Sequence, residues 1–188
     1  MAESSRKIYT RFGDRGQTKL LSGETAAKDD LRVEAYGTLD ELQSHLGMAR
    51  SLVQEETVRS ILHAVQKDLF IAGAELASTP QRLSRLENRL EAKDISKLEH
   101  WIDQMTDQYG MPGGFVIPGD SPASAALHVA RSVCRRAERL IVRLNRSTRS
   151  YGDLIIYINR LSDLLFVLAW STALTAAIED VLDAWPAP

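Results

Sequence analysis

Apolar side chains recur at intervals of three and four residues along most of the chain, which is the spacing of one face of an α-helix. Runs of this kind cover residues 39–52, 58–76 and 95–105. Residues 1–29 are polar, carry three glycines and show no helical period. The pattern predicts that helices begin at about Asp30 and follow an irregular N-terminal segment.

Two longer helices are predicted after a turn-rich stretch at residues 109–120. The fourth helix should start at Ser121, whose hydroxyl can accept a hydrogen bond from the first turn, with Pro122 at the first helical position. The fifth should run from about Asp153 to about Asp180 and is apolar nearly all round, which suits a central helix or an oligomer interface. Helices of about 25 residues would be about 37 Å long. We therefore predict an all-α fold, an elongated helical bundle.

The same pattern predicts one domain. A chain of 188 residues is long enough for one hydrophobic core and short for two. It has no internal repeat and no low-complexity linker. We divide it into an N-terminal segment at residues 1–29, a helical bundle at 30–180 and a loose tail at 181–188.

Composition and charge narrow the function classes. Hydrophobic residues make up 44% and charged residues 26% of the chain, so it is neither disordered nor fibrous. A formal charge of -2 argues against broad binding to nucleic acid, which needs a net basic surface. The single cysteine, Cys134, excludes an intramolecular disulfide and a cysteine-based structural zinc site.

Neither secretion nor a membrane span is expected. The first residues, MAESSRKIYT, contain no apolar signal core, which favours a cytoplasmic protein. The most apolar stretch, residues 154–178, carries Arg160 and Asp163 near its centre. A charge at bilayer depth costs about 2.5–3.5 kcal/mol, so a buried helix of a soluble bundle is the better interpretation.

Residues 9–19 combine glycines with hydroxyl and basic side chains. Gly13 and Gly16 let backbone N–H groups approach an anion closely, and Lys19 adds positive charge. Such a loop could bind phosphate groups. The alternative, which the spacing alone favours, is a hairpin turn at Gly13 and Asp14 between two short extended pieces. The eight-residue P-loop pattern is absent from the chain.

The fourth predicted helix carries a row of arginines opposite its apolar face, which we call the arginine stripe. Its members are Arg131, Arg135, Arg136, Arg139, Arg143, Arg146 and Arg149, interrupted by Glu138. Guanidinium groups pair bidentately with phosphate or carboxylate. A charged helix face is usually only solvated, but here the cations cluster in a chain that is acidic overall, which favours a binding role.

The fifth predicted helix carries a polar group within its apolar sequence. Asn159 and Asp163 are one turn apart on the same face. An Asp in this setting must be paired, because an isolated buried carboxylate destabilises a fold. It is either a structural partner of an arginine on the neighbouring helix or part of a site, and both interpretations can hold.

The same alternatives apply to Asp40 and Glu41 on the first predicted helix. Thr38 and Glu41 have the spacing of a capping box, which leaves open a start or an interruption of that helix at Gly37. The four histidines, His45, His63, His100 and His128, form no HExxH pair and no recurring Glu-x-x-His pair. Each is interpreted as an ordinary helix residue, and no metal ligand is assigned among the protein side chains.

Taken together, these features resemble the PduO-type ATP:corrinoid adenosyltransferases, from about Lys7 to about Ala173. The segments that carry the resemblance are IYTRFGDRGQTKLLSGE (8–24), KDDLRVEAYGTLDEL (28–42), FVIPGDSPASAALHVARSVCRRAERLIV (115–142) and INRLSDLLFVLA (158–169). The resemblance implies a ferritin-like, up-and-down five-helix bundle that forms a homotrimer with active sites between subunits.

The resemblance also implies the reaction: ATP with Mg²⁺ adenosylates cob(I)alamin, giving adenosylcobalamin and triphosphate. The magnesium ion would be held through the ATP phosphates. A cobalamin reductase and an adenosylcobalamin-dependent enzyme are the implied partners. Because the cofactor supplies the nucleophile, no catalytic triad is needed, and none is visible in the sequence.

Site residues follow from the same resemblance. ATP contacts are implied at Thr10, Arg11, Phe12, Gly13, Thr18, Lys19, Lys28, Arg135, Arg136, Glu138, Arg139 and Asn159. Arg131 and Asp40 match a salt bridge across the subunit interface and join Arg135 as catalytic residues. Phe115 and Phe166 match aromatic residues below the corrin ring, with Asp163 assigned beside them. The sequence departs from the family at Phe12 and Lys19, where hydroxylated residues are usual.

Three hypotheses remain at this point. The enzyme is the leading one, and a non-catalytic protein that senses ATP or delivers adenosylcobalamin is the alternative. A structural trimer without ligand is the third. From the residues alone, Phe115 would be interpreted as a loop aromatic that caps the core.

Overall fold

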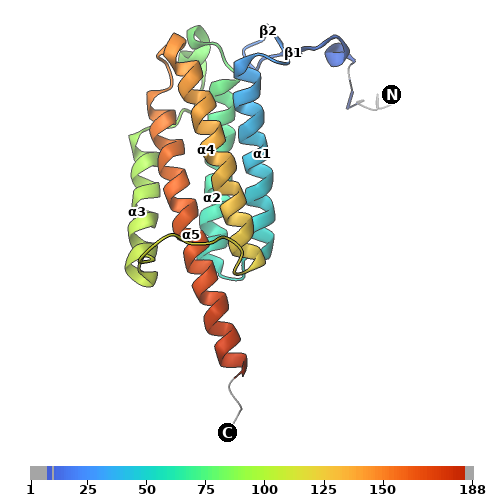
Figure 1. Ribbon diagram of the computed structural model, residues 1–188. Coiled ribbons are helices and arrows are strands. Elements are labelled where there is room, and N and C mark those ends of the chain that lie inside the picture. The colour runs from blue at the N-terminus through green and yellow to red at the C-terminus, as the bar shows by residue number, and fades with distance from the viewer. Residues whose placement is uncertain (1–7, 10, 185–188) are drawn as a thin grey trace, which may run out of the picture.

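Long α-helices run side by side along one axis in the computed structural model, which describes residues 8–9 and 11–184 (Figure 1). The helices are α1 (Leu31–Leu52), α2 (Glu56–Leu76), α3 (Ala92–Tyr109), α4 (Pro122–Thr148) and α5 (Gly152–Ala184). Short 3₁₀ turns, η1 (Phe12–Arg15) and η2 (Pro80–Arg85), and the strands β1 (Gln17–Lys19) and β2 (Thr25–Ala27) complete the described elements. The predicted all-α bundle is confirmed.

The start of α1 follows from its capping residue. The Asp30 side chain accepts a hydrogen bond from the Arg32 amide at 2.8 Å, which satisfies a free donor of the first turn. Gly37 lies inside the helix, so neither a start nor an interruption occurs there. The Thr38 hydroxyl donates to the Glu34 carbonyl at 2.8 Å and makes no capping box. The helix tolerates Gly37 at a cost of about 1 kcal/mol relative to alanine.

The hairpin occurs later in the chain than predicted. Gly13 and Asp14 lie within η1, and the turn follows β1, which pairs antiparallel with β2 with Gln17 opposite Ala27. The turn then docks on the end of α2, where the Leu21 amide donates to the Ala77 carbonyl at 2.8 Å. The N-terminal segment is therefore anchored to the bundle at the C-terminal end of α2.

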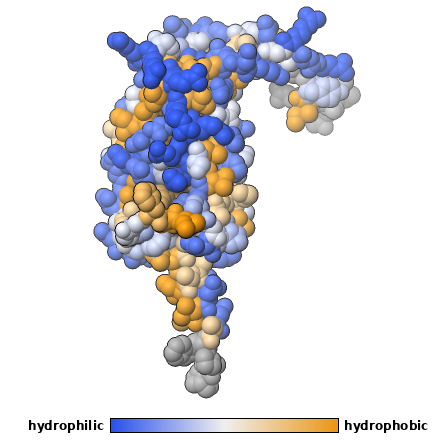
Figure 2. Space-filling model, viewed as in Figure 1, coloured by the Kyte–Doolittle hydropathy of each residue, from blue (hydrophilic) through white to orange (hydrophobic). Residues whose placement is uncertain are grey.

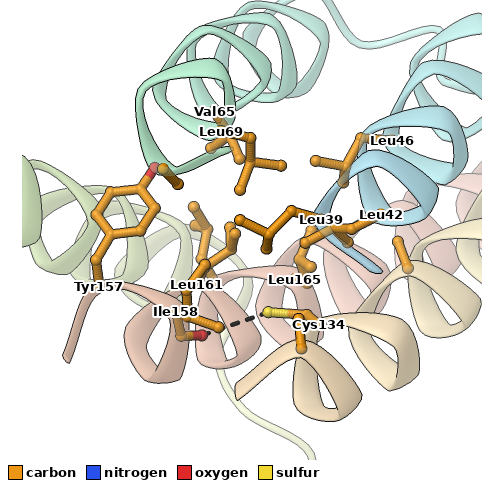
Figure 3. Close-up of a cluster of buried hydrophobic side chains, with 14 of the residues drawn as sticks. Leu39, Leu42, Leu46, Val65, Leu69, Cys134, Tyr157, Ile158, Leu161 and Leu165 are labelled. Carbon is orange, nitrogen blue, oxygen red and sulfur yellow. Dashed lines mark hydrogen bonds between the residues drawn. The ribbon is translucent and has the colours of Figure 1, made fainter. Parts of the chain in front are cut away.

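The core contains buried side chains from all five α-helices. Figure 3 shows Leu39, Leu42 and Leu46 of α1 facing Leu161 and Leu165 of α5, and all five are buried. At about 25 cal/mol for each Å² of apolar surface removed from water, such burial is the main stabilising term. The close packing of α4 on α5 is visible at Cys134, whose thiol donates to the Ile158 carbonyl at 3.3 Å.

The helix α5 lies between α3 and α4, and its C-terminal part extends beyond the bundle (Figure 1). By length and composition, α5 alone among the described residues could cross a membrane, yet 56% of its most apolar stretch is buried against the bundle. Burial in a core accounts for that composition. The helix continues to Ala184, so the predicted tail is wrong for residues 181–184, and residues 185–188 lie outside the described part.

Candidate functional site

The exposed face of α4 forms a groove of about 450 Å³. The groove is lined by Pro118, Ala125, His128, Val129, Arg131, Ser132, Val133, Arg136 and Arg139. The helix turns Ala130, Ala137 and Ile141 toward the core, which leaves Arg135, Arg136 and Arg139 exposed. Figure 2 shows hydrophilic side chains gathered on the face that α4 and α5 share, with apolar side chains below them.

Two contacts join predicted site residues to one another. The Asn159 side chain of α5 donates to Glu138 of α4 at 3.0 Å, which brings together two residues that were assigned to the ATP site. Arg136 forms an ion pair with Glu41 of α1. Arg135 and Arg139, by contrast, have no ion-pair partner among the described residues, so their guanidinium groups are free for an anion.

The prediction for Asp163 is wrong in its partner and its setting. Its side chain is 52% exposed, and it pairs with Arg160 of its own helix at 3.2 Å. Arg160 in turn donates to Glu99 of α3 at 3.0 Å. The apolar sequence around Asp163 suggested a buried carboxylate, but its position falls on the narrow face of α5 that remains open to solvent. No arginine of α4 pairs with it in the described part of the chain.

At the other end of the groove, the Phe166 side chain lies close to His128 and Arg131. Its ring lies edge to face with His128 at 6.1 Å between centroids, and the Arg131 guanidinium lies 6.0 Å from its centroid. Phe166 is only partly buried. His128 was not predicted as a site residue, although it lies one turn before Arg131 on the same face of the helix.

The loop between α3 and α4 crosses the bundle (Figure 1). Phe115 and Ile117 in this loop are fully or almost fully exposed. The alternative that Phe115 caps the core is therefore wrong. Pro118 of the same loop lines the groove, so the loop places exposed apolar side chains close to it.

The N-terminal segment assembles a second group of predicted residues. The Lys19 ammonium lies 5.3 Å from the centre of the Phe12 ring, and the Lys28 amide donates to the Gly16 carbonyl at 2.8 Å. A Cβ added to Gly13 would lie 3.0 Å from the Lys28 ammonium, so only glycine leaves this lysine undisturbed. The ammonium groups of Lys19 and Lys28 therefore both lie close to η1.

Three further predicted ATP-binding residues belong to the N-terminal segment. Thr18 lies at the centre of β1, opposite Ala26. Arg11 adopts a left-handed backbone conformation, with a φ of 62°, immediately before η1. Thr10 lies outside the described residues.

Within one chain the two predicted halves of the ATP site lie apart. Figure 1 shows η1 projecting sideways beyond α1, away from the bundle. No ion pair joins Asp40 to Arg131 within the described chain, and Asp40 is exposed on α1.

Comparison with known proteins places this geometry in a family. Residues 8–172 match the family model for cobalamin adenosyltransferase. A corrinoid adenosyltransferase from Citrobacter freundii is 49% identical over 163 residues, which cover 87% of this chain and 93% of that protein. The corrinoid adenosyltransferase PduO of Salmonella typhimurium is 42% identical over 86% of this chain, which spans only 48% of that longer protein.

A solved structure shares both fold and sequence with this chain. It is a variant of a PduO-type ATP:corrinoid adenosyltransferase from Lactobacillus reuteri, complexed with cobalamin and ATP. The TM-score is 0.83 at 38% sequence identity, and the match covers 91% of this chain and 96% of the other.

Proposed function

Because this chain belongs to the cobalamin adenosyltransferase family, we infer that it transfers the 5′-deoxyadenosyl group of ATP to cob(I)alamin. The products are adenosylcobalamin and triphosphate. The enzyme is thus a transferase, and a non-catalytic sensor or delivery protein is not favoured. The observation that carries this function is the pair of exposed arginines on α4, Arg135 and Arg139, which have no ion-pair partner among the described residues; Arg139 lines the groove.

The reaction chemistry explains why cationic and apolar side chains are sufficient for catalysis. Co(I) supplies both electrons of the new bond to the ribose C5′, and the electrons of the C5′–O bond leave with triphosphate. The protein must align the two substrates and stabilise charge on the leaving group. Arg135, Arg139 and Lys28 are donors of the right kind, and no general base is required.

Magnesium is proposed as the companion of ATP. Among the residues that the structure describes, no three His, Cys, Asp or Glu side chains are close enough to hold a metal ion. The ion would be bound through the phosphates of ATP.

We further propose that the enzyme is a homotrimer with its sites between subunits. The separation of η1 from the α4 groove within one chain supports this assembly (Figure 1). In it, Thr10, Arg11, Phe12, Gly13, Thr18, Lys19 and Lys28 of one copy would face Arg135, Arg136, Glu138, Arg139 and Asn159 of the next. Phe115 and Phe166 would lie beneath the corrin ring. A cobalamin reductase would supply the electron, and an adenosylcobalamin-dependent enzyme would use the product.

The activity is tested under anaerobic conditions. The protein, MgATP and chemically reduced cobalamin should convert the Co(I) absorption spectrum to that of the alkylated cofactor. Arg135→Ala should lower kcat by about 10²–10³-fold, because a preorganised donor to developing charge is removed. The matched control is Arg146→Ala, an exposed arginine about three turns further along α4, which should keep wild-type activity. If wild-type protein binds both substrates without turnover, it is a binding protein and not an enzyme.

A further inference from the structure

One end of the α4 groove contains buried polar atoms that have no hydrogen-bond partner in the described part of the chain. His128 is 4% exposed, and neither of its ring nitrogens has a hydrogen-bond partner among residues 8–9 and 11–184. The Arg131 Nε, one turn further along the helix, is also buried without a partner there. Both side chains line the groove and contact the Phe166 ring.

Such atoms are unusual enough to require an explanation. More than about 90% of buried polar groups in folded proteins have a partner. Each buried group without one costs about 1–3 kcal/mol. An apolar side chain at position 128 would avoid that cost. The histidine is therefore better explained by the binding of a ligand than by stabilisation of the fold.

The chemistry of the ring narrows the ligand. Burial lowers the pKa of His128, the charge of Arg131 lowers it further, and Asp120 opposes the shift. The ring is therefore neutral near pH 7, with one nitrogen that donates and one that accepts. Arg131 adds the Nε donor. A group that both accepts and donates while uncharged, such as a primary carboxamide, matches this set better than a phosphate.

Position along the groove separates this end from the phosphate end. On α4, His128 is seven residues from Arg135 and eleven from Arg139, which is about 10 and 16 Å along the helix axis. A triphosphate held at both arginines would therefore lie about 10 Å or further along the axis from His128. The His128 end, beside Phe166 and the exposed apolar loop, must receive a different part of the ligands.

We propose that His128 recognises the peripheral carboxamide groups of the corrin ring and positions the corrinoid above Phe166. This inference rests on the proposed function, since it assumes that a corrinoid is the substrate. One ring nitrogen would donate to a carboxamide oxygen and the other would accept from a carboxamide N–H, while Arg131 Nε donates to a second oxygen. His128 is thus a positioning residue for the substrate that carries the nucleophile.

The test compares His128→Leu, which removes both ring nitrogens, with His128→Gln, which keeps a donor and an acceptor. Affinity for cob(II)alamin is measured by its spectral change with MgATP present, and affinity for MgATP alone by calorimetry. His128→Leu should weaken cobalamin binding at least tenfold and raise the KM for cob(I)alamin more than it lowers kcat. MgATP affinity should stay within twofold. His128→Gln should weaken cobalamin binding less than His128→Leu does. If the leucine variant is insoluble, the comparison of His128→Gln with wild type is the test.

A second corrinoid identifies the part of the substrate that is recognised. Cobinamide keeps the ring carboxamides and lacks the lower nucleotide, so His128→Leu should weaken its binding as much as that of cobalamin. Equal affinity of wild type and His128→Leu for both corrinoids would overturn the inference. A loss confined to cobalamin would also overturn it, because the contact would then be to the nucleotide.

Two controls separate this inference from the proposed function and from folding. His100→Leu, an exposed position on α3, should leave every affinity unchanged. His128→Leu without ligands should melt at or above the wild-type temperature and keep the same mass in light scattering, since a buried unsatisfied group is removed. A change of mass would assign His128 to the subunit interface and overturn its substrate role. A wild-type protein that binds no corrinoid would contradict the proposed function itself.

Discussion

At the scale of single residues, the protonation of His128 makes a prediction about stability. A histidine in the unfolded chain titrates near pH 6.5, and burial lowers the pKa of His128 in the fold. The unfolded state therefore binds more protons as the pH falls below about 6.5, and the free energy of unfolding decreases.

Denaturation in urea at pH 7.5 and pH 5.5 checks this expectation. The wild-type protein should lose more stability between the two values than His128→Leu does. The same loss in both proteins would mean that His128 does not titrate with a lowered pKa.

Single residues also show where sequence patterns reach their limit. The apolar context of Asp163 indicated burial, yet its side chain is 52% exposed because a helix with one open face places its polar residues there. Arg131 and His128 lie one turn apart, but sequence alone shows neither their burial nor their missing partners. The contact between Asn159 and Glu138 could be inferred from the sequence, because both residues are assigned to one site and lie on neighbouring helices.

At the scale of elements, Arg32 is the residue that fixes the N-terminal segment. This side chain of α1 is buried and donates to the Leu76 and Ser78 carbonyls at 2.9 and 2.7 Å and to the Tyr151 hydroxyl. These carbonyls belong to the end of α2, beside the Ala77 carbonyl that holds the hairpin turn. Arg32 therefore positions the segment that carries Lys19 and Lys28.

Arg32→Met should destabilise the protein by about 2–3 kcal/mol, because charge-assisted hydrogen bonds to buried carbonyls are lost. In addition, the KM for ATP should rise as the hairpin loosens. The Leu21 amide should exchange with solvent faster in the variant at equal global stability. Arg82→Met, which removes an exposed pair with Glu24, is the milder control, with an effect below about 1 kcal/mol. Unchanged exchange at Leu21 would show that the turn is held without Arg32.

The elements themselves were largely predictable where the apolar period is long. The Ser121 cap and Pro122 gave the start of α4 correctly, with the Ser121 hydroxyl accepting from the Ser124 amide at 3.2 Å. The hairpin was misplaced because its strands have three residues each, too few to show an alternating pattern. Docking on α2, a contact distant in sequence, selects its position.

At the scale of the whole molecule, the arrangement of charges predicts how copies associate. Asp40 is exposed on α1, and Arg131 lies half-buried on α4 in the same chain without pairing with it. A head-to-tail contact that closes into a ring brings one such face against the other in every interface. The proposed homotrimer would place Asp40 of one copy beside Arg131 of the next.

Asp40→Arg should weaken the assembly and the activity together, measured by light scattering and turnover. The double variant Asp40→Arg with Arg131→Asp restores opposite charges and should recover the oligomer at least in part. Additive losses in the double variant would contradict direct pairing. The exposed Glu87 of the chain serves as the control, since Glu87→Arg changes the net charge equally without touching either face.

The buried sulfur of Cys134 has a practical consequence. This thiol is sealed between α4 and α5, and burial raises its pKa far above the ordinary value, so it stays protonated and unreactive. The chain has no other cysteine. A cysteine introduced on the surface would therefore be the one attachment point for a maleimide dye, without any need to engineer the native thiol away. Fluorophores placed at the tip of η1 and at the foot of α4 could then report, through energy transfer between mixed protomers, how these two surfaces meet as ligands arrive.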